Sequence, residues 1–171
     1  AFKHIALMPD AHSGYGMPIG GVMAADGVIV PNAVGVDIGC GMCAVKTDLK
    51  FTPTLQKYFS KIVDEIKERV PVGFKHHKRT QDEALMPKGY KIGGMEVVRS
   101  EYNSALRQLG TLGGGNHFIE IQKDKEDFVW IMIHSESRNI GKQVADHYNK
   151  LAKKLNKQWN SPVPPKADLA Y

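Results

Sequence analysis

A short glycine-bounded turn and two separate histidines carry the side chains best suited to bind a metal ion. Asp37 and Cys40 stand three residues apart, and glycines on both sides of the cysteine allow a sharp turn. A hard carboxylate oxygen beside a soft sulfur favours a divalent cation. The simpler interpretation of an isolated Asp-x-x-Cys is a packed cysteine in a turn.

The two histidines shift this balance towards a metal site. His117 follows three glycines and Asn116 at the start of one predicted strand, and His134 ends the next strong strand. Imidazoles at neighbouring strand ends can converge beside the turn that holds Asp37 and Cys40. Each histidine alone has a structural role more often than not. The four residues together favour a metal site, and their ligand chemistry admits zinc, manganese or iron.

The spacing of Cys40 and Cys43, the two cysteines in the sequence, also allows a redox interpretation. A redox pair places its first cysteine at a helix N-terminus, where the helix dipole lowers the thiol pKa. Residues 42–47 instead have the pattern of a strand. Metal binding is therefore favoured over redox chemistry, and we interpret Cys43 as a packed strand residue.

An α+β fold is predicted to position these residues. Helical periodicity covers 54–70, 96–109 and 140–160, with a capping threonine at 52 or 54 and Gly110 after the second helix. The predicted strands are 5–8, 28–30, 42–47, 117–121 and 128–133. We expect one domain, 1–171, in which a mixed sheet built from 4–47 and 117–134 is covered by three helices.

Composition bounds the function classes. The chain has 171 residues, of which 42% are hydrophobic and 24% charged, as in ordinary globular proteins. The sequence has no apolar run of the roughly 18 residues that a membrane span needs, and no signal peptide is recognisable, so a cytoplasmic protein without membrane partners is expected. The formal net charge of +5 is compatible with a polyanionic partner.

Several longer motifs together resemble those of the RtcB family of RNA-splicing ligases, in the same order along the chain. They span residues 8–141, most of the sequence, and are far more specific than any single motif. The matching segments are 8–14 (MPDAHSG), 19–22 (IGGV), 34–42 (VGVDIGCGM), 109–120 (LGTLGGGNHFIE) and 134–138 (HSESR).

The resemblance implies a GTP-dependent ligase that uses manganese. Such an enzyme joins an RNA 2′,3′-cyclic phosphate or 3′-phosphate end to a 5′-hydroxyl end, in tRNA splicing or RNA repair. By motif, Asp37, Cys40 and His117 would bind one Mn²⁺ ion, and Cys40, as a bridge, would bind a second together with His134. A thiolate between two cations screens their mutual repulsion, and two such cations can orient a phosphate for in-line displacement.

The resemblance also implies roles for four further residues. Asn116 corresponds to the asparagine that contacts the guanylate, and Arg138 to a contact with an RNA phosphate. The planar guanidinium of Arg138 suits a phosphate, although a solvated arginine near a helix start is the simpler interpretation. Asp10 and His12 fall in a segment that lines the catalytic site.

The sequence departs from the family pattern in its extent. Family members are generally more than twice as long, and their C-terminal half supplies another metal-binding histidine and the histidine that is guanylylated. None of the remaining histidines (His4, His76, His77 and His147) lies in a matching motif. We therefore expect an N-terminal portion of the catalytic core that is inactive alone and leaves apolar surface exposed.

Glu136 stands where family members usually have glycine. A carboxylate there is expected to repel an RNA phosphate unless it pairs with Arg138 or points outward. The RNA substrate and any activating partner protein are therefore left open. The alternative function is a non-catalytic metal- or RNA-binding module, in which the basic run Lys75–Arg79 binds phosphates or is only a solvated surface.

Overall fold

The structure is a computed structural model that describes residues 2–88 and 95–171 and confirms the α+β class. It contains two compact units, one made of Ala1–Ile38 with Gly141–Tyr171 and the other of Gly39–Ile140. The structure has two antiparallel sheets instead of the expected single mixed sheet. Residues 2–12 pair with 19–25 in the first unit, and residues 41–50 pair with 128–135 in the second. The organisation of 1–171 as one domain stays a prediction.

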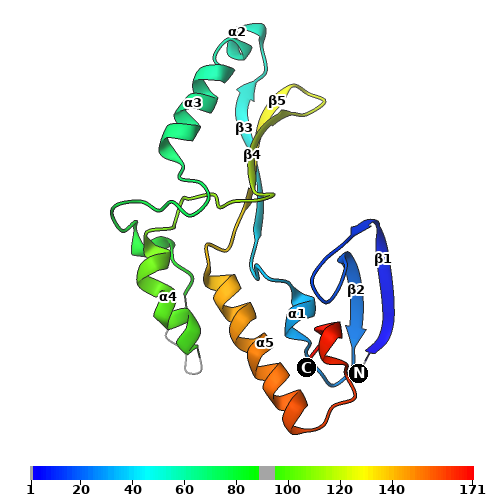
Figure 1. Ribbon diagram of the computed structural model, residues 1–171. Helices are drawn as coiled ribbons and strands as arrows, with labels where there is room; N and C mark the ends of the chain where they lie inside the picture. Colours follow the sequence, from blue (N-terminus) through cyan, green and yellow to red (C-terminus); the bar gives the residue numbers. More distant parts are fainter. Residues whose placement is uncertain (1, 89–94) are drawn as a thin grey trace. The chain divides into compact units, whose positions relative to one another are not determined.

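The second unit contains a three-stranded sheet with the order β3-β5-β4 (Figure 1). Its strands are β3 (Gly41–Lys50), β4 (Phe118–Lys123) and β5 (Phe128–Ser135). The central strand is antiparallel to both neighbours, and His134 lies opposite Met42 on one side and Phe118 on the other. The start of β3, the start of β4 and the end of β5 therefore share one edge of the sheet.

The turn between β4 and β5 is closed by Asp124, at the far end of this hairpin from His134. One carboxylate oxygen accepts from the backbone N–H groups of Glu126 and Phe128, each at 2.9 Å. The other accepts from the indole N–H of Trp130 at 2.9 Å and pairs with Lys46 at 3.1 Å. The hydrogen bond from Trp130, above all, holds the pKa of the Asp124 carboxyl well below its usual range. The ionised carboxylate thus fixes the hairpin register.

The predicted helix 54–70 forms as two helices, α2 (Pro53–Gln56) and α3 (Phe59–Arg69). Thr52 caps α2 as predicted, since its hydroxyl oxygen accepts from the backbone N–H of Leu55 at 3.1 Å. Tyr58 then bonds back only three residues, to the carbonyl of Leu55. This tight turn breaks the helix.

The remaining helices of this unit are the 3₁₀ turn η1 (Glu83–Leu85) and α4 (Glu96–Leu106). The predicted end of this helix at 109, with Gly110 as its stop, is wrong: α4 ends at Leu106 with Arg107 as its C-cap, and Gly110, with a φ of +71°, lies in the turn beyond. Residues 89–94 lie outside the described part of the chain.

The first unit consists of the hairpin β1 (Phe2–His12) and β2 (Ile19–Ala25), the short helix α1 (Pro31–Val34), most of α5 (Ile140–Gln158) and the 3₁₀ turn η2 (Pro165–Ala167). The expected strand 28–30 is wrong, because these residues form an irregular connection from β2 to α1. Buried Asn156 of α5 fastens the end of the chain, accepting from the N–H of Tyr171 and donating to its carbonyl.

Apolar side chains are widely exposed, as expected. In the β1–β2 hairpin they include Leu7 at 61% and Val22 at 56%. No helix among the described residues is both long and apolar enough to cross a membrane.

Candidate metal centre

Cys40, His117 and His134 form a compact cluster of potential metal ligands at one edge of the three-stranded sheet. One ligand atom from each of the three lies within 4.8 Å of the other two. Cys40 directly precedes β3, His117 directly precedes β4, and His134 is the penultimate residue of β5. The antiparallel order of the strands brings together residues from three distant stretches of sequence. The predicted convergence of the two histidines on the Cys40 turn is therefore found.

The imidazole of His117 is oriented by a backbone carbonyl. Its Nδ1 bonds to the carbonyl oxygen of Gly114, and its Nε2 lies 3.3 Å from the Sγ of Cys40. If Nδ1 carries the proton and donates it to the carbonyl, the lone pair of Nε2 faces the cysteine. A histidine that ligates a metal is commonly held in this way by its other nitrogen. The carbonyl of Gly114 could not be recognised from side-chain patterns, because every residue carries one.

The spacing of the cluster fits a first coordination sphere. Ligand bonds of about 2.0–2.3 Å at tetrahedral angles place neighbouring donor atoms about 3.5 Å apart. The separation of 3.3 Å between Cys40 Sγ and His117 Nε2 is close to that value. The imidazole rings of His117 and His134 have centroids 4.7 Å apart. Two imidazoles and a thiolate suit a transition metal better than calcium or magnesium.

The other predicted ligand, Asp37, belongs to the first unit, half-buried in the connection between α1 and β3. Asp10 and His12 lie in β1 of the same unit. Both are exposed, and Nδ1 of His12 lies 3.0 Å from the backbone carbonyl oxygen of Asp10. The roles of these three residues stay predictions.

Arg138 is largely enclosed, with only 10% of its side chain exposed. Its Nη1 pairs with the carboxylate of Glu136, and its Nη2 donates to the backbone carbonyl of Gly73 at 2.8 Å. Glu136 thus forms the pair with Arg138 that would limit its repulsion of a phosphate. The role of the Gly73 carbonyl was missed in the sequence, because the contact joins residues 65 positions apart.

Gly113 explains part of the glycine run that precedes His117. Its φ is +105°, and a Cβ at this position would lie 2.4 Å from the Cβ of Glu136. The backbone N–H of Glu136 also donates to the carbonyl of Leu112 at 3.0 Å. The end of β5 therefore packs directly on this segment, and only glycine fits there.

Asn116 is exposed and adjoins His117, so a ligand beside the cluster could reach its amide. Cys43 lies within β3 opposite Ile133, so the strand assignment is confirmed, but its side chain is exposed and the expected packing is wrong. Cys40 is followed by a strand and not by a helix, so the helix dipole that supports a redox pair is missing from this segment.

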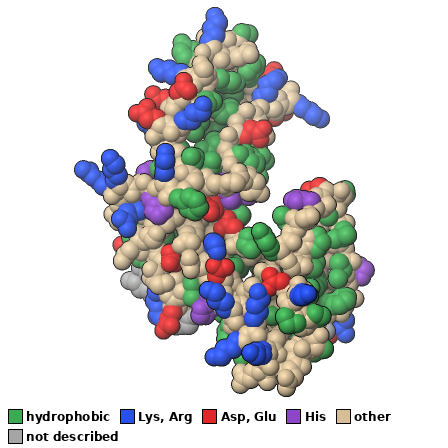
Figure 2. All heavy atoms as spheres, in the orientation of Figure 1, with side chains coloured by type: hydrophobic (Ala, Val, Ile, Leu, Met, Phe, Trp, Pro, Cys, Tyr) green, Lys and Arg blue, Asp and Glu red, His purple; other side chains and the backbone are tan. Residues whose placement is uncertain are grey.

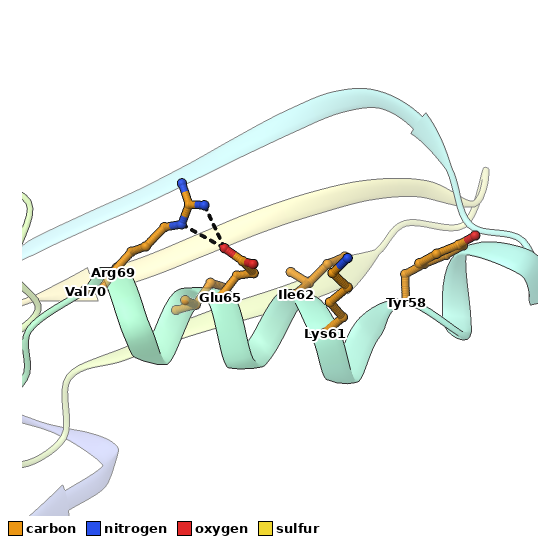
Figure 3. A pocket seen from close by; sticks show the side chains of 7 residues that line it. Tyr58, Lys61, Ile62, Glu65, Arg69 and Val70 are labelled. Atoms are coloured by element: carbon orange, nitrogen blue, oxygen red, sulfur yellow. Dashed lines mark hydrogen bonds and ion pairs between the residues drawn. The ribbon is translucent and has the colours of Figure 1, made fainter.

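A hollow of about 500 Å³ runs along α3, and no predicted site residue is among those that line it (Figure 3). Glu65 and Arg69 form an ion pair across its rim at 2.8 Å. Its lining residues are Tyr58, Lys61, Ile62, Glu65, Ile66, Arg69 and Val70.

Comparison with known proteins gives the family. The tRNA-splicing ligase RtcB family matches residues 1–104 and 87–171. The RNA-splicing ligase RtcB of Escherichia coli K12 is 39% identical over 184 aligned positions, covering 99% of this chain and 45% of that protein. The tRNA-splicing ligase RtcB of Thermococcus kodakarensis is 34% identical, covering 95% of this chain and 43% of that protein. The chain thus spans less than half the length of these curated relatives, and it belongs to the tRNA-splicing ligase RtcB family.

Proposed function

We propose that this chain is part of an RNA ligase that uses GTP and Mn²⁺ to join a 2′,3′-cyclic phosphate or 3′-phosphate RNA end to a 5′-hydroxyl end. Family membership supports the ligase activity, since the relatives are named RNA- or tRNA-splicing ligases. The observation that carries the proposal is the clustering of Cys40, His117 and His134. We place the activity in tRNA splicing or RNA repair, in the cytoplasm, where the exposed thiol of Cys40 stays reduced.

The residues of the cluster would hold manganese, with Asp37 as a further ligand and Cys40 shared between two ions. When bound, the ions polarise phosphate oxygens and offset the negative charge that develops in phosphoryl transfer. The donor set alone also accommodates zinc or iron, so manganese follows from the family resemblance. His117 presents Nε2 to the site because Gly114 occupies its Nδ1.

Side chains next to the cluster would bind the nucleotide and the RNA. Asn116, exposed beside His117, would contact the guanylate. Arg138 would contact the RNA phosphate through the Nη1 that Glu136 now occupies, while its Nη2 keeps the Gly73 carbonyl. Asp10 and His12 would line the catalytic site. The proposal names no activating partner protein. The joining assay includes a lysate fraction that could supply one.

The test is RNA joining by the protein expressed from its complete gene. Two RNAs, one ending in a 2′,3′-cyclic phosphate and one beginning with a 5′-hydroxyl, should be joined only when GTP and Mn²⁺ are both present. His117→Ala should abolish joining, while Cys43→Ser should leave it within a few-fold of wild type. Salt-dependent RNA binding without joining, with and without a lysate fraction, would instead support the non-catalytic module.

A further inference from the structure

A fully exposed phenylalanine stands at the tip of a loop that is otherwise firmly anchored. Phe74 has no neighbour that shields its ring, since its side chain is as exposed as in an extended peptide. It sits in a turn in which Lys75 N–H donates to the carbonyl of Val72, and Gly73 supplies the required φ of +60°. A single exposed apolar residue is common on protein surfaces, so a binding role for this ring depends on the residues around it.

The residues that follow Phe74 are all cationic or imidazole side chains. Residues 75–79 read Lys-His-His-Lys-Arg, and the next acidic residue is Asp82. Within the described ranges 2–88 and 95–171, Lys75, Lys78 and Arg79 form no ion pair with a carboxylate. Figure 2 shows Lys, Arg and His side chains gathered over the loop that follows α3. We call residues 72–79 the Phe74 loop.

The Phe74 loop is fixed by backbone hydrogen bonds at both ends. The N–H of Gly73 donates to the carbonyl of Gly113 at 2.9 Å, and the N–H of His77 donates to the carbonyl of Arg107 at 2.9 Å. Arg138 adds a third anchor through its bond to the Gly73 carbonyl. The ring of Phe74 is therefore presented on a held backbone, which lowers the entropy lost when a ligand binds.

The same anchors connect the Phe74 loop to the candidate metal centre. Val72 and Gly113 form a β-bridge, and Gly114 directly follows with the carbonyl that orients His117. A Cβ on Gly114 would lie 3.5 Å from the Cα of Gly73. The segment Gly113–Gly114 thus contacts both the Phe74 loop and His117. A nucleic acid strand bound to the loop would therefore lie next to the candidate metal centre.

We propose that the Phe74 loop binds the single-stranded end of the RNA, with one base stacked on Phe74 and phosphates held by Lys75, Lys78 and Arg79. An exposed aromatic ring beside unpaired cations is the combination that binds single-stranded nucleic acid without reading its sequence. The inference rests on the proposed function for its choice of RNA, and it adds the subsite that holds the strand. Arg138 serves it as a positioning residue through Gly73.

The first test measures binding of a 12-nucleotide single-stranded RNA by fluorescence anisotropy, using the protein expressed from its complete gene. Phe74→Ala should weaken binding about 5- to 150-fold, the fold-change that corresponds to stacking of about 1–3 kcal/mol. Phe74→Tyr should restore it. The matched control is Trp159→Ala, because Trp159 is also an exposed aromatic residue, 61% accessible, and directly follows α5.

The second test separates stacking from charge. An RNA that lacks its bases should bind wild type and Phe74→Ala equally, because no base is left to stack. The logarithm of RNA affinity falls with the logarithm of salt concentration, and replacing Lys75, Lys78 and Arg79 with alanine should make this slope about 2 less negative. Alanines at Lys150, Lys154 and Lys157 are the control and should leave the slope unchanged.

Two outcomes would overturn the inference. One is an unchanged affinity and an unchanged rate of joining in Phe74→Ala. The other is a lowered melting temperature of that variant without weaker RNA binding, which would show that protein covers the ring. If the protein binds RNA through Phe74 and yet joins no ends, the proposed function fails while this inference stands.

Discussion

Replacing Cys40 with serine tests the metal centre most directly. The hydroxyl of serine nearly matches the thiol in size, but it does not ionise near neutral pH and is a poor ligand. The change removes one of three clustered donors while leaving His117 and His134 in place. Even residues that only orient ligands cost about 10- to 100-fold in metal affinity when replaced. We therefore expect Cys40→Ser to raise the dissociation constant for Mn²⁺ at least about 100-fold, the upper end of that range.

The expected loss can be expressed as stability. At a Mn²⁺ concentration about 100 times the wild-type dissociation constant, binding stabilises the folded protein by about 2.7 kcal/mol. With the constant raised about 100-fold, the same concentration contributes only about 0.4 kcal/mol. Urea unfolding with and without Mn²⁺ measures both values, and isothermal titration measures the affinities.

Cys43→Ser is the matched control for this experiment. Cys43 is also an exposed cysteine, but it lies within β3 opposite Ile133 and outside the ligand cluster. Its variant should keep the full stabilisation by Mn²⁺. Equal losses in the two variants, or retention of the full effect in Cys40→Ser, would refute the argument from the cluster.

Four further outcomes are expected. Asp37→Asn should weaken Mn²⁺ binding about 10-fold by titration, and an unchanged affinity would remove Asp37 from the ligand set. Glu136→Gln should tighten RNA binding about 2- to 5-fold in an anisotropy assay by freeing Arg138, whereas no change would count against a phosphate contact there. The 171-residue chain, incubated with labelled GTP and Mn²⁺, should show no covalent label on a denaturing gel, because no histidine in it matches the motif of the nucleophile. Because the pKa of Asp124 is lowered, its contribution to the stability of the folded protein is present at neutral pH and is lost as the pH falls below about 4. The urea midpoint of unfolding, measured through this pH range, should therefore fall less steeply in Asp124→Asn than in wild type. An equal fall of the midpoint in both proteins would contradict the role of the Trp130 hydrogen bond.

The local elements and the residue types of the site could be predicted from short stretches of sequence. Periodicity predicted α5 and both strands of the β4–β5 hairpin, and capping chemistry predicted Thr52 at the start of α2. These features depend on residues close together in the chain, so their physical causes are visible in a short window. The motif order likewise pointed to the family that the comparisons show.

The pairing of the strands and the surroundings of each site residue could not be predicted in this way, because they depend on how the chain folds. β1 and β3 both have strand patterns, yet one pairs with β2 and the other with β5, because strand pairing depends on contacts between distant segments. The bond from His117 to Gly114 and the bond from Arg138 to Gly73 end on backbone carbonyls. Carbonyls carry no signature in the sequence, so these contacts, and the Phe74 loop that one of them anchors, are set by the folded backbone.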